Sequence, residues 1–282
     1  MITIRTREEL RDRVDEARSE GTVVLVPTMG FLHEGHLSLI DRAHEISGCV
    51  VASVFVNPLQ FAPSEDLDRY PRDIDRDRRL LEERGVTICF TPTVEEMYPS
   101  GNPRIFVEPG AMGERLCGRH RPGHFRGVLT VVARLFGLVR PDAAIFGQKD
   151  YQQGVLIRRM VEDLEMKVRV ELGPISREPD GLARSSRNAL LSPEERKQAG
   201  GLHGALSSAA IRFEAGESDP TVLVRAVEDE VARYDRLRLQ YAELVDPETL
   251  DPVVRARSDS VIAAAAFAGD TRLIDNIVLG AP

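Results

Sequence analysis

The chain has 282 residues, of which 42% are hydrophobic and 29% charged, as expected for a globular protein with a sizeable core. Its net charge of −8 disfavours a nucleic-acid surface, which needs basic side chains against phosphates. The charged N-terminus lacks the apolar core of a signal peptide, and no apolar run approaches the roughly 18 residues of a membrane span, so we expect a cytoplasmic protein without a membrane partner.

The first part of the chain alternates short apolar runs with amphipathic segments. Strands are predicted at residues 22–26, 50–56, 86–90, 143–147 and 167–172, and helices at 36–46, 73–84, 128–139 and 151–164. Such alternation is typical of βαβ units around a parallel sheet. We therefore predict an α/β fold, with a Rossmann-like parallel sheet domain over residues 1–175.

The alternation of apolar strands with amphipathic helices ends after residue 172. A turn-rich stretch (173–188) precedes a helix that we expect to begin at a Ser192 cap with Pro193 in its first position. Strand-like runs follow at 238–246, 260–269 and 271–280, which predicts a smaller α+β C-terminal lid domain over residues 176–282. The three cysteines, Cys49, Cys89 and Cys117, are odd in number and widely spaced, which disfavours a disulfide framework or a thiolate zinc site. Cys49 and Cys89 are expected to be buried.

The segment "VPTMGFLHEGHLSLI" (26–40) contains two of the six histidines where the first predicted strand gives way to a helix. His36 is predicted to open that helix. The carboxyl end of a parallel strand and a helix N-terminus together favour phosphate binding, and Gly30 and Gly35 allow a close backbone approach. Zinc is disfavoured because H-E-x-x-H needs histidines four apart, and no G-x-G-x-x-G is present. Alternatively, His33 and His36 simply cap the helix.

Five strings in order carry a family resemblance: "PTMGFLHEGHLSLI", "FVNPLQF", "RPGHFRGV", "FGQKDYQQ" and "SSRN". They resemble the pantothenate synthetase family of the HxGH nucleotidyltransferase superfamily, closely from Pro27 to Asn188 and thinly beyond. The resemblance implies ATP-dependent condensation of pantoate with β-alanine through a pantoyl-adenylate, with release of pyrophosphate and AMP. It also implies a homodimer. ATP itself is expected to bring Mg²⁺ to the site, and the sequence assigns no protein ligand to the metal.

The resemblance implies roles for individual residues. His36, with His33 beside it, and Lys149 are the expected catalytic groups; Gln60 and Gln153 would hold pantoate, and Gln60 would also serve β-alanine. Lys149 is one of three lysines, and its compact ammonium suits a moving phosphate. The implied ATP-binding residues are Met29, Gly30, Phe31, Leu32, His33, Glu34, Gly35, His36, Gly147, Gln148, Lys149, Asp150, Ser176, Arg184, Ser185, Ser186 and Arg187.

Several questions stay open in the sequence. The family usually has apolar residues where Ser176 and Arg184 stand, which leaves the adenine contacts in doubt. Asp150 can cap the next helix or touch the ribose, and the loop 119–128 can be a gate or a subunit contact. The acidic stretch 66–77 can offer ligands to Mg²⁺, although a solvated helix face is preferred.

Two other functions compete with the ligase. One is an adenylyltransferase acting on a phosphate ester, which the neutral Gln60 argues against. The other is a nucleotide-sensing module without catalysis, which we disfavour because both histidines and Lys149 are present.

Overall fold

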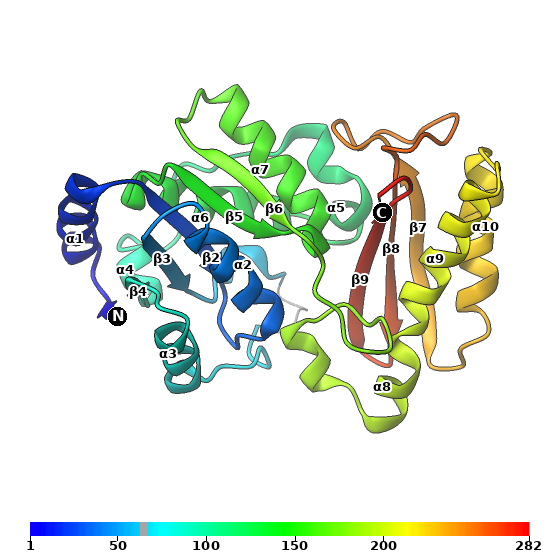
Figure 1. The fold of residues 1–282 in the computed structure, drawn as a ribbon, viewed down its shortest axis with the longest axis horizontal. Coiled ribbons are helices and arrows are strands. Elements are labelled where there is room, and N and C mark those ends of the chain that lie inside the picture. The colour runs from blue at the N-terminus through cyan, green and yellow to red at the C-terminus, as the bar shows by residue number, and fades with distance from the viewer. Residues whose placement is uncertain (63–66, 282) are drawn as a thin grey trace. The chain divides into compact units, whose positions relative to one another are not determined.

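The structure is a computed structural model that describes residues 1–62 and 67–281. The chain forms two compact units (Figure 1). The first unit comprises Met1–Gly113, Arg121–Gln148 and Leu156–Pro174, and the second comprises Glu114–His120, Lys149–Val155 and Ile175–Pro282. The second unit therefore takes in two short earlier segments, and the separate domains predicted over 1–175 and 176–282 stay a prediction.

The first unit is built on a six-stranded sheet in which every neighbouring pair of strands is parallel. The strand order is β1-β4-β3-β2-β5-β6. The strands are β1 (Ile2–Ile4), β2 (Val23–Thr28), β3 (Cys49–Val54), β4 (Ile88–Phe90), β5 (Ala143–Gly147) and β6 (Arg169–Gly173). The predicted Rossmann-like parallel sheet is confirmed.

Helices connect these strands, as βαβ crossovers require. They are α1 (Arg7–Glu20), α2 (Glu34–His44), α3 (Ile74–Glu83), α4 (Val94–Met97), α6 (His124–Val139) and α7 (Tyr151–Asp163), with 3-10 turns η1 (Pro58–Gln60), η2 (Gly110–Glu114) and η3 (Gln148–Asp150). Buried side chains of α2 and α3, including Ile40 and Leu81, join those of β2, β3 and β5 in one core cluster. The central strand β2 is apolar from Val23 to Val26 because it is covered on both faces.

The second unit contains a three-stranded antiparallel sheet in the order β7-β8-β9, with helices packed against it. Its elements are α5 (Leu116–His120), η4 (Ser186–Leu190), α8 (Pro193–Ala199), α9 (Gly201–Glu214), α10 (Pro220–Val231), β7 (Leu237–Val245), β8 (Val261–Ala268) and β9 (Thr271–Val278). The alanine run 263–266 lies in the central strand β8, where every residue of it is buried. Ala264 and Ala266 share a core with Ala205 and Ala209 of α9, because small side chains let helix and sheet approach closely.

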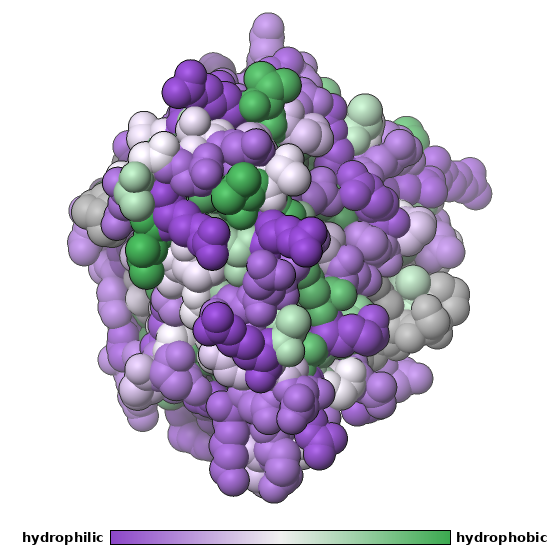
Figure 2. All heavy atoms as spheres, turned by 90° about the vertical axis from the view of Figure 1, so that its right-hand side faces the viewer, coloured by the Kyte–Doolittle hydropathy of each residue, from purple (hydrophilic) through white to green (hydrophobic). Residues whose placement is uncertain are grey.

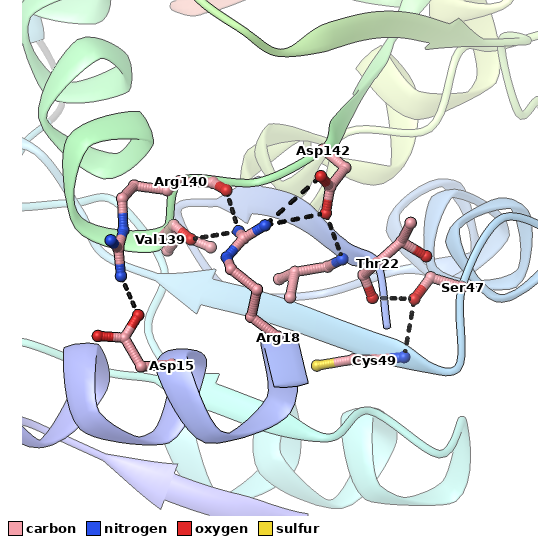
Figure 3. Close-up of polar contacts among 9 residues, drawn as sticks. Asp15, Arg18, Thr22, Ser47, Cys49, Val139, Arg140 and Asp142 are labelled. Atoms are coloured by element: carbon pink, nitrogen blue, oxygen red, sulfur yellow. Dashed lines mark hydrogen bonds and ion pairs between the residues drawn. The ribbon is translucent and has the colours of Figure 1, made fainter. Parts of the chain in front are cut away.

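Polar contacts join the segments at the amino ends of the central strands (Figure 3). Asp142, just before β5, accepts a 2.7 Å hydrogen bond from the Val23 N–H at the start of β2. Arg18 lies 3.3 Å from the same carboxylate and also donates to the main-chain oxygen of Arg140, which ends α6 with a positive φ of 47°. Ser47 donates to the Thr22 carbonyl at 2.5 Å. These contacts lie opposite the carboxyl ends of the strands.

The sequence missed β1, α1, α4 and α5, and predicted the other strand ends to within about two residues. It succeeded at Ser192, which caps α8 through a capping box with Glu195 and has Pro193 in the first helical position. In the described part of the chain, no helix is long and apolar enough to cross a membrane. On the face shown in Figure 2, hydrophobic side chains are scattered among hydrophilic ones and form no single patch.

Candidate active site

The strand order of the first unit marks where a ligand would bind. The chain passes from β2 to β3 on one side of β2, whereas β5 lies on the other side. Open α/β sheets bind ligands at such a switch point, outside the carboxyl ends of the strands. Three segments lie at these ends: residues 29–36 after β2, residues 55–60 after β3, and Gly147, the last residue of β5, with Gln148. Most of the predicted site residues of this unit therefore come from one edge of the sheet.

The turn after β2 is held by tight local contacts. Thr28 donates its hydroxyl to the Ser53 carbonyl at 2.8 Å and accepts from the Gly30 N–H at 3.2 Å. Gly30 has a φ of +84°, and a Cβ there would lie 2.8 Å from the Val54 side chain and 2.9 Å from that of Asp77. Only glycine fits this position without strain.

Helix α2 begins at Glu34, so the start predicted at His36 is wrong by two residues. His33 is the N-cap of α2, and His36 is its third residue. The ring of His33 accepts from the Gly35 N–H at 3.2 Å through Nδ1, and the His33 N–H donates to Nδ1 of His36 at 3.3 Å. The chain forms a capping box in which imidazoles take the places usual for Ser and Glu.

This capping arrangement fixes the tautomer of both rings. A ring nitrogen that accepts a hydrogen bond carries no proton, so each neutral imidazole bears its hydrogen on Nε2. The two ring centroids lie 4.0 Å apart. The capping bonds of His33 and His36 therefore use Nδ1, and a ligand-binding role at Nε2 would leave these bonds in place.

Asp77 on α3 holds the histidine loop and was missed by the sequence. Its carboxylate accepts from the backbone N–H groups of Phe31 and Leu32, each at 2.7 Å, and its side chain is 1% exposed. The solvated helix face preferred for this acidic stretch is thus wrong at Asp77; Asp66 of the same stretch lies outside the described residues. Burial raises the pKa of the Asp77 carboxyl, and the two amide bonds oppose that rise.

Gln60 is oriented by Asn57, a second residue that the sequence did not single out. Asn57 Nδ2 donates to the Gly127 carbonyl, and its Oδ1 accepts from the Leu59 N–H and the Tyr98 hydroxyl, so the two ends of this amide cannot be exchanged. Asn57 Nδ2 also donates to Gln60 Oε1 at 3.1 Å. The Gln60 oxygen is therefore engaged by Asn57, and the amide presents its Nε2 donor, which lies 3.0 Å from the sulfur of Met29.

The loop before α6 contacts Gln60 from another direction. His124 Nδ1 lies 2.8 Å from the Gln60 carbonyl oxygen, and Arg121 donates to the same oxygen at 3.3 Å. Arg121 also lies 2.9 Å from Nε2 of His124. These contacts tie residues 121–124 to the Gln60 turn, while the roles of gate and subunit contact both stay open.

The second unit carries the remaining predicted residues. Lys149 Nζ lies 3.7 Å from Asp150 Oδ2, and both residues belong to η3, which directly precedes α7. Gln153 is half-buried in the first turn of α7. The neighbouring Gln152 is buried instead and donates to the Arg115 carbonyl at 2.8 Å. Whether Asp150 caps α7 stays a prediction.

The turn-rich stretch before α8 folds into a small hairpin. Arg177 pairs with Ala183, and the Arg184 N–H donates to the Ser176 carbonyl at 2.9 Å. Through this backbone bond, the two residues that depart from the family pattern, Ser176 and Arg184, face each other across the hairpin base. The Arg184 guanidinium lies 3.1 Å from Glu178. Ser185 then caps η4, in which Ser186 is buried and Arg187 is half-buried.

Metal-ligating side chains and thiols are not clustered in the described part of the chain. Among the described residues, no group of three or more His, Cys, Asp or Glu side chains is arranged to hold a metal ion. The three cysteines are free. Cys89 is fully buried, which raises its pKa to about 11, and Cys117 is also buried, whereas Cys49 is only half-buried, contrary to expectation.

Comparisons with known proteins point to one family. The family model for pantoate-beta-alanine ligase matches residues 2–278. The curated pantothenate synthetase of Thermotoga neapolitana is 52% identical over 281 residues, covering 99% of this chain and 100% of that protein. A crystal structure of pantothenate synthetase from Thermus thermophilus is 48% identical, with a TM-score of 0.94 and 99% coverage of both chains.

A more distant solved structure is a complex with ligands. It is the pantoate-beta-alanine ligase from Francisella tularensis complexed with beta-gamma ATP and beta-alanine. It is 30% identical to this chain, with a TM-score of 0.83, and covers 100% of this chain and 99% of its own.

Proposed function

This chain belongs to the pantoate–β-alanine ligase family and is a ligase that forms pantothenate, and on that premise we propose that it works through a pantoyl-adenylate. The carboxylate of pantoate attacks the α-phosphorus of ATP, a new P–O bond forms, and the bond to pyrophosphate breaks. The amine of β-alanine then attacks the activated acyl carbon, loses a proton, and releases AMP. ATP as substrate is supported by the ligand-bound relative.

The observation that carries this proposal is the orientation of the two imidazoles. Both rings accept backbone N–H bonds at Nδ1, so both keep Nε2 as a donor at the carboxyl end of β2. In the first step negative charge builds on the α-phosphoryl oxygens and on the leaving pyrophosphate, and fixed donors aimed at that charge lower the barrier. We assign this task to His36, with His33 beside it.

The remaining phosphate contacts are assigned to the second unit. Lys149 carries a compact positive charge on a short turn, and its side chain is 19% exposed. Ser185, Ser186 and Arg187 offer two hydroxyls and a guanidinium, groups that suit the β- and γ-phosphates. Residues 29–36, with Gly147, Gln148, Asp150, Ser176 and Arg184, complete the proposed ATP contacts, and the adenine contacts at Ser176 and Arg184 are through backbone atoms.

Gln60 and Gln153 are the proposed pantoate residues. The Gln60 amide presents Nε2, so it suits an oxygen acceptor such as the substrate carboxylate. A neutral donor binds that carboxylate without the full charge pairing that would reduce its nucleophilicity. The same donor would next bind β-alanine through its carboxylate.

The surrounding features stay predictions. We propose that Mg²⁺ enters with the phosphates of ATP, because Mg²⁺ commonly binds through substrate phosphates and retained water. The homodimer and the cytoplasmic location rest on the family resemblance and the sequence composition.

An isotope experiment tests the adenylate. If the pantoate carboxylate attacks phosphorus, pantoate labelled with ¹⁸O in that carboxylate delivers one label to the phosphate of AMP, while the other stays in pantothenate. Mass spectrometry of the AMP released in the presence of β-alanine measures this transfer. Unlabelled AMP formed in equal amount with pantothenate would rule out the proposed first step.

A further inference from the structure

Two adjacent residues of β9, Asp275 and Asn276, are polar and nearly fully buried, with exposures of 4% and 2%. Consecutive side chains of a strand point to opposite faces of the sheet. Asp275 shares its face with Leu273 and Ile277, which pack in the apolar core with α9. A carboxylate within an apolar face costs free energy unless it is paired, so its partner must account for its presence.

The partner of Asp275 is Arg177 in the hairpin that leads to η4. The two side chains form a bidentate pair, with distances of 2.6 and 3.0 Å, and the Asp275 side chain is 3% exposed. The same guanidinium donates to the Gly181 carbonyl at the hairpin turn at 3.0 Å. One buried carboxylate thereby fixes both an arm and the tip of the hairpin relative to β9.

The hairpin tip is also fitted to α9. Gly181 has a φ of +88°, and a Cβ there would lie 2.6 Å from the His203 ring. Nδ1 of His203 lies 3.7 Å from Asp275. The tip therefore cannot slide along α9 without losing the Arg177–Asp275 pair. Because Ser185 follows Arg184 directly, the position of this hairpin sets the position of Ser185, Ser186 and Arg187.

Asn276 binds the other phosphate-contacting segment of the same unit. Its Nδ2 donates to the main-chain oxygen of Lys149 at 3.1 Å. This contact joins residues 127 positions apart and fixes the backbone of the turn from which the Lys149 side chain extends. Without this hydrogen bond the turn could move, and the Lys149 ammonium would be displaced from the position that catalysis requires.

We propose that Asp275 and Asn276 are positioning residues. Strand β9 holds the Lys149 turn through Asn276 and the 176–184 hairpin through Asp275. It thereby fixes the positions of both proposed phosphate-binding segments of this unit relative to each other. The proposal rests on the phosphate roles proposed above for Lys149 and Ser185–Arg187. A purely structural role predicts that the two substitutions lower stability alike and leave the ratio of ATP to pantoate Michaelis constants unchanged.

The test compares three full-length variants with the wild type. Asn276→Leu keeps the side-chain volume and removes the donor, and Asp275→Asn removes the charge from the bidentate pair. Gln240→Leu is the matched control, because Gln240 accepts a 2.9 Å bond from Arg272, also on β9, and this bond reaches neither phosphate segment. Hydrogen exchange of the peptides covering 149–155 and 176–188 is measured with the steady-state constants.

For Asn276→Leu we expect faster exchange in 149–155 and a rise of about three- to tenfold in the Michaelis constant for ATP, with that for pantoate changed less than about twofold. For Asp275→Asn we expect faster exchange in 176–188 and a loss of about tenfold or more in kcat/KM for ATP, since the bond involves charged groups. Gln240→Leu should change neither segment. If Asp275→Asn does not fold, Arg177→Lys, which keeps the charge and loses the bidentate geometry, replaces it.

A double-mutant cycle separates positioning from general loosening. In a Lys149→Ala background, adding Asn276→Leu should change the ATP Michaelis constant by less than about twofold, because the residue acts through Lys149. Unchanged exchange in both segments, or faster exchange with unchanged ATP constants, would overturn the inference. The isotope transfer measured on wild-type enzyme decides the proposed function separately, since it involves none of these variants.

Discussion

Replacing Asp77 by Asn tests whether the buried carboxylate positions the histidine loop. The carboxylate accepts two backbone N–H groups at 2.7 Å, whereas an asparagine supplies one oxygen and one NH₂. One amide of Phe31 or Leu32 would therefore face another donor. A buried donor left without an acceptor costs about 1–3 kcal/mol. The loop can relieve this cost only by moving, which would displace His33 and His36.

The expected result is a loss of turnover with little loss of stability. If the cost appears as lost transition-state stabilisation, turnover falls by about 5- to 150-fold. Burial raises the pKa of the Asp77 carboxyl, so burying the charge disfavours folding more than its hydrogen bonds favour it. Removing the charge therefore offsets part of the free energy of unfolding that is lost with the hydrogen bond. The melting temperature should change by only a few degrees, ~5 °C at most.

The assay is pantothenate formation at saturating substrates, with the melting temperature measured on the same preparations. Asp75→Asn is the matched control, because it makes the same change on the same helix at an exposed position. Turnover of Asp77→Asn within twofold of that control, at equal stability, would refute the positioning of the histidine loop by Asp77.

Three further predictions follow from the site. His36→Ala should lower turnover by about 10²-fold or more, the scale for losing one preorganised donor, while ATP binding measured by calorimetry stays within about tenfold; turnover within threefold of wild type would remove His36 from the mechanism. Arg184→Leu should change the Michaelis constant for ATP by less than about tenfold, because the guanidinium pairs with Glu178 in the hairpin, and a larger loss would show that it binds phosphate. Burial and Arg177 lower the pKa of His203, so just below pH 6.5 the unfolded chain binds more protons than the folded chain, and the free energy of unfolding decreases as pH falls there. His203→Gln should make the free energy of unfolding, measured with denaturant, depend less on pH between about pH 5 and 7. An unchanged pH dependence would contradict the lowered pKa of His203.

The sequence predicted the parallel sheet well because its strands carry strong local signals. The apolar run of β2 and the glycine- and histidine-rich turn after it identify both the strand and the expected ligand edge without tertiary information. The position of the histidines within the helix start was wrong, since capping by imidazole is unusual and no pattern distinguishes an N-cap from the third helical residue in "HEGH".

The residues that position the site were missed for a common physical reason. Asp77 lies among other acidic residues, and only the fold shows that its carboxylate turns inward to backbone amides. Asn57 and Asn276 act through bonds to Gln60 and to the Lys149 carbonyl, and Asp275 through a pair with Arg177. The one available signal was the adjacent pair Asp275 and Asn276, which interrupts the apolar run 273–278, because apolar side chains are expected on both faces of a buried strand.

The central claim is that pantoate is activated by ATP before β-alanine reacts. Enzyme, ATP, Mg²⁺ and pantoate alone, incubated with labelled pyrophosphate, measure this directly, because reversal of adenylate formation returns the label to ATP. We predict exchange that requires pantoate, proceeds without β-alanine, and falls by about 10²-fold or more in His36→Ala. Exchange that strictly requires β-alanine would contradict the two-step account even if pantothenate is the product.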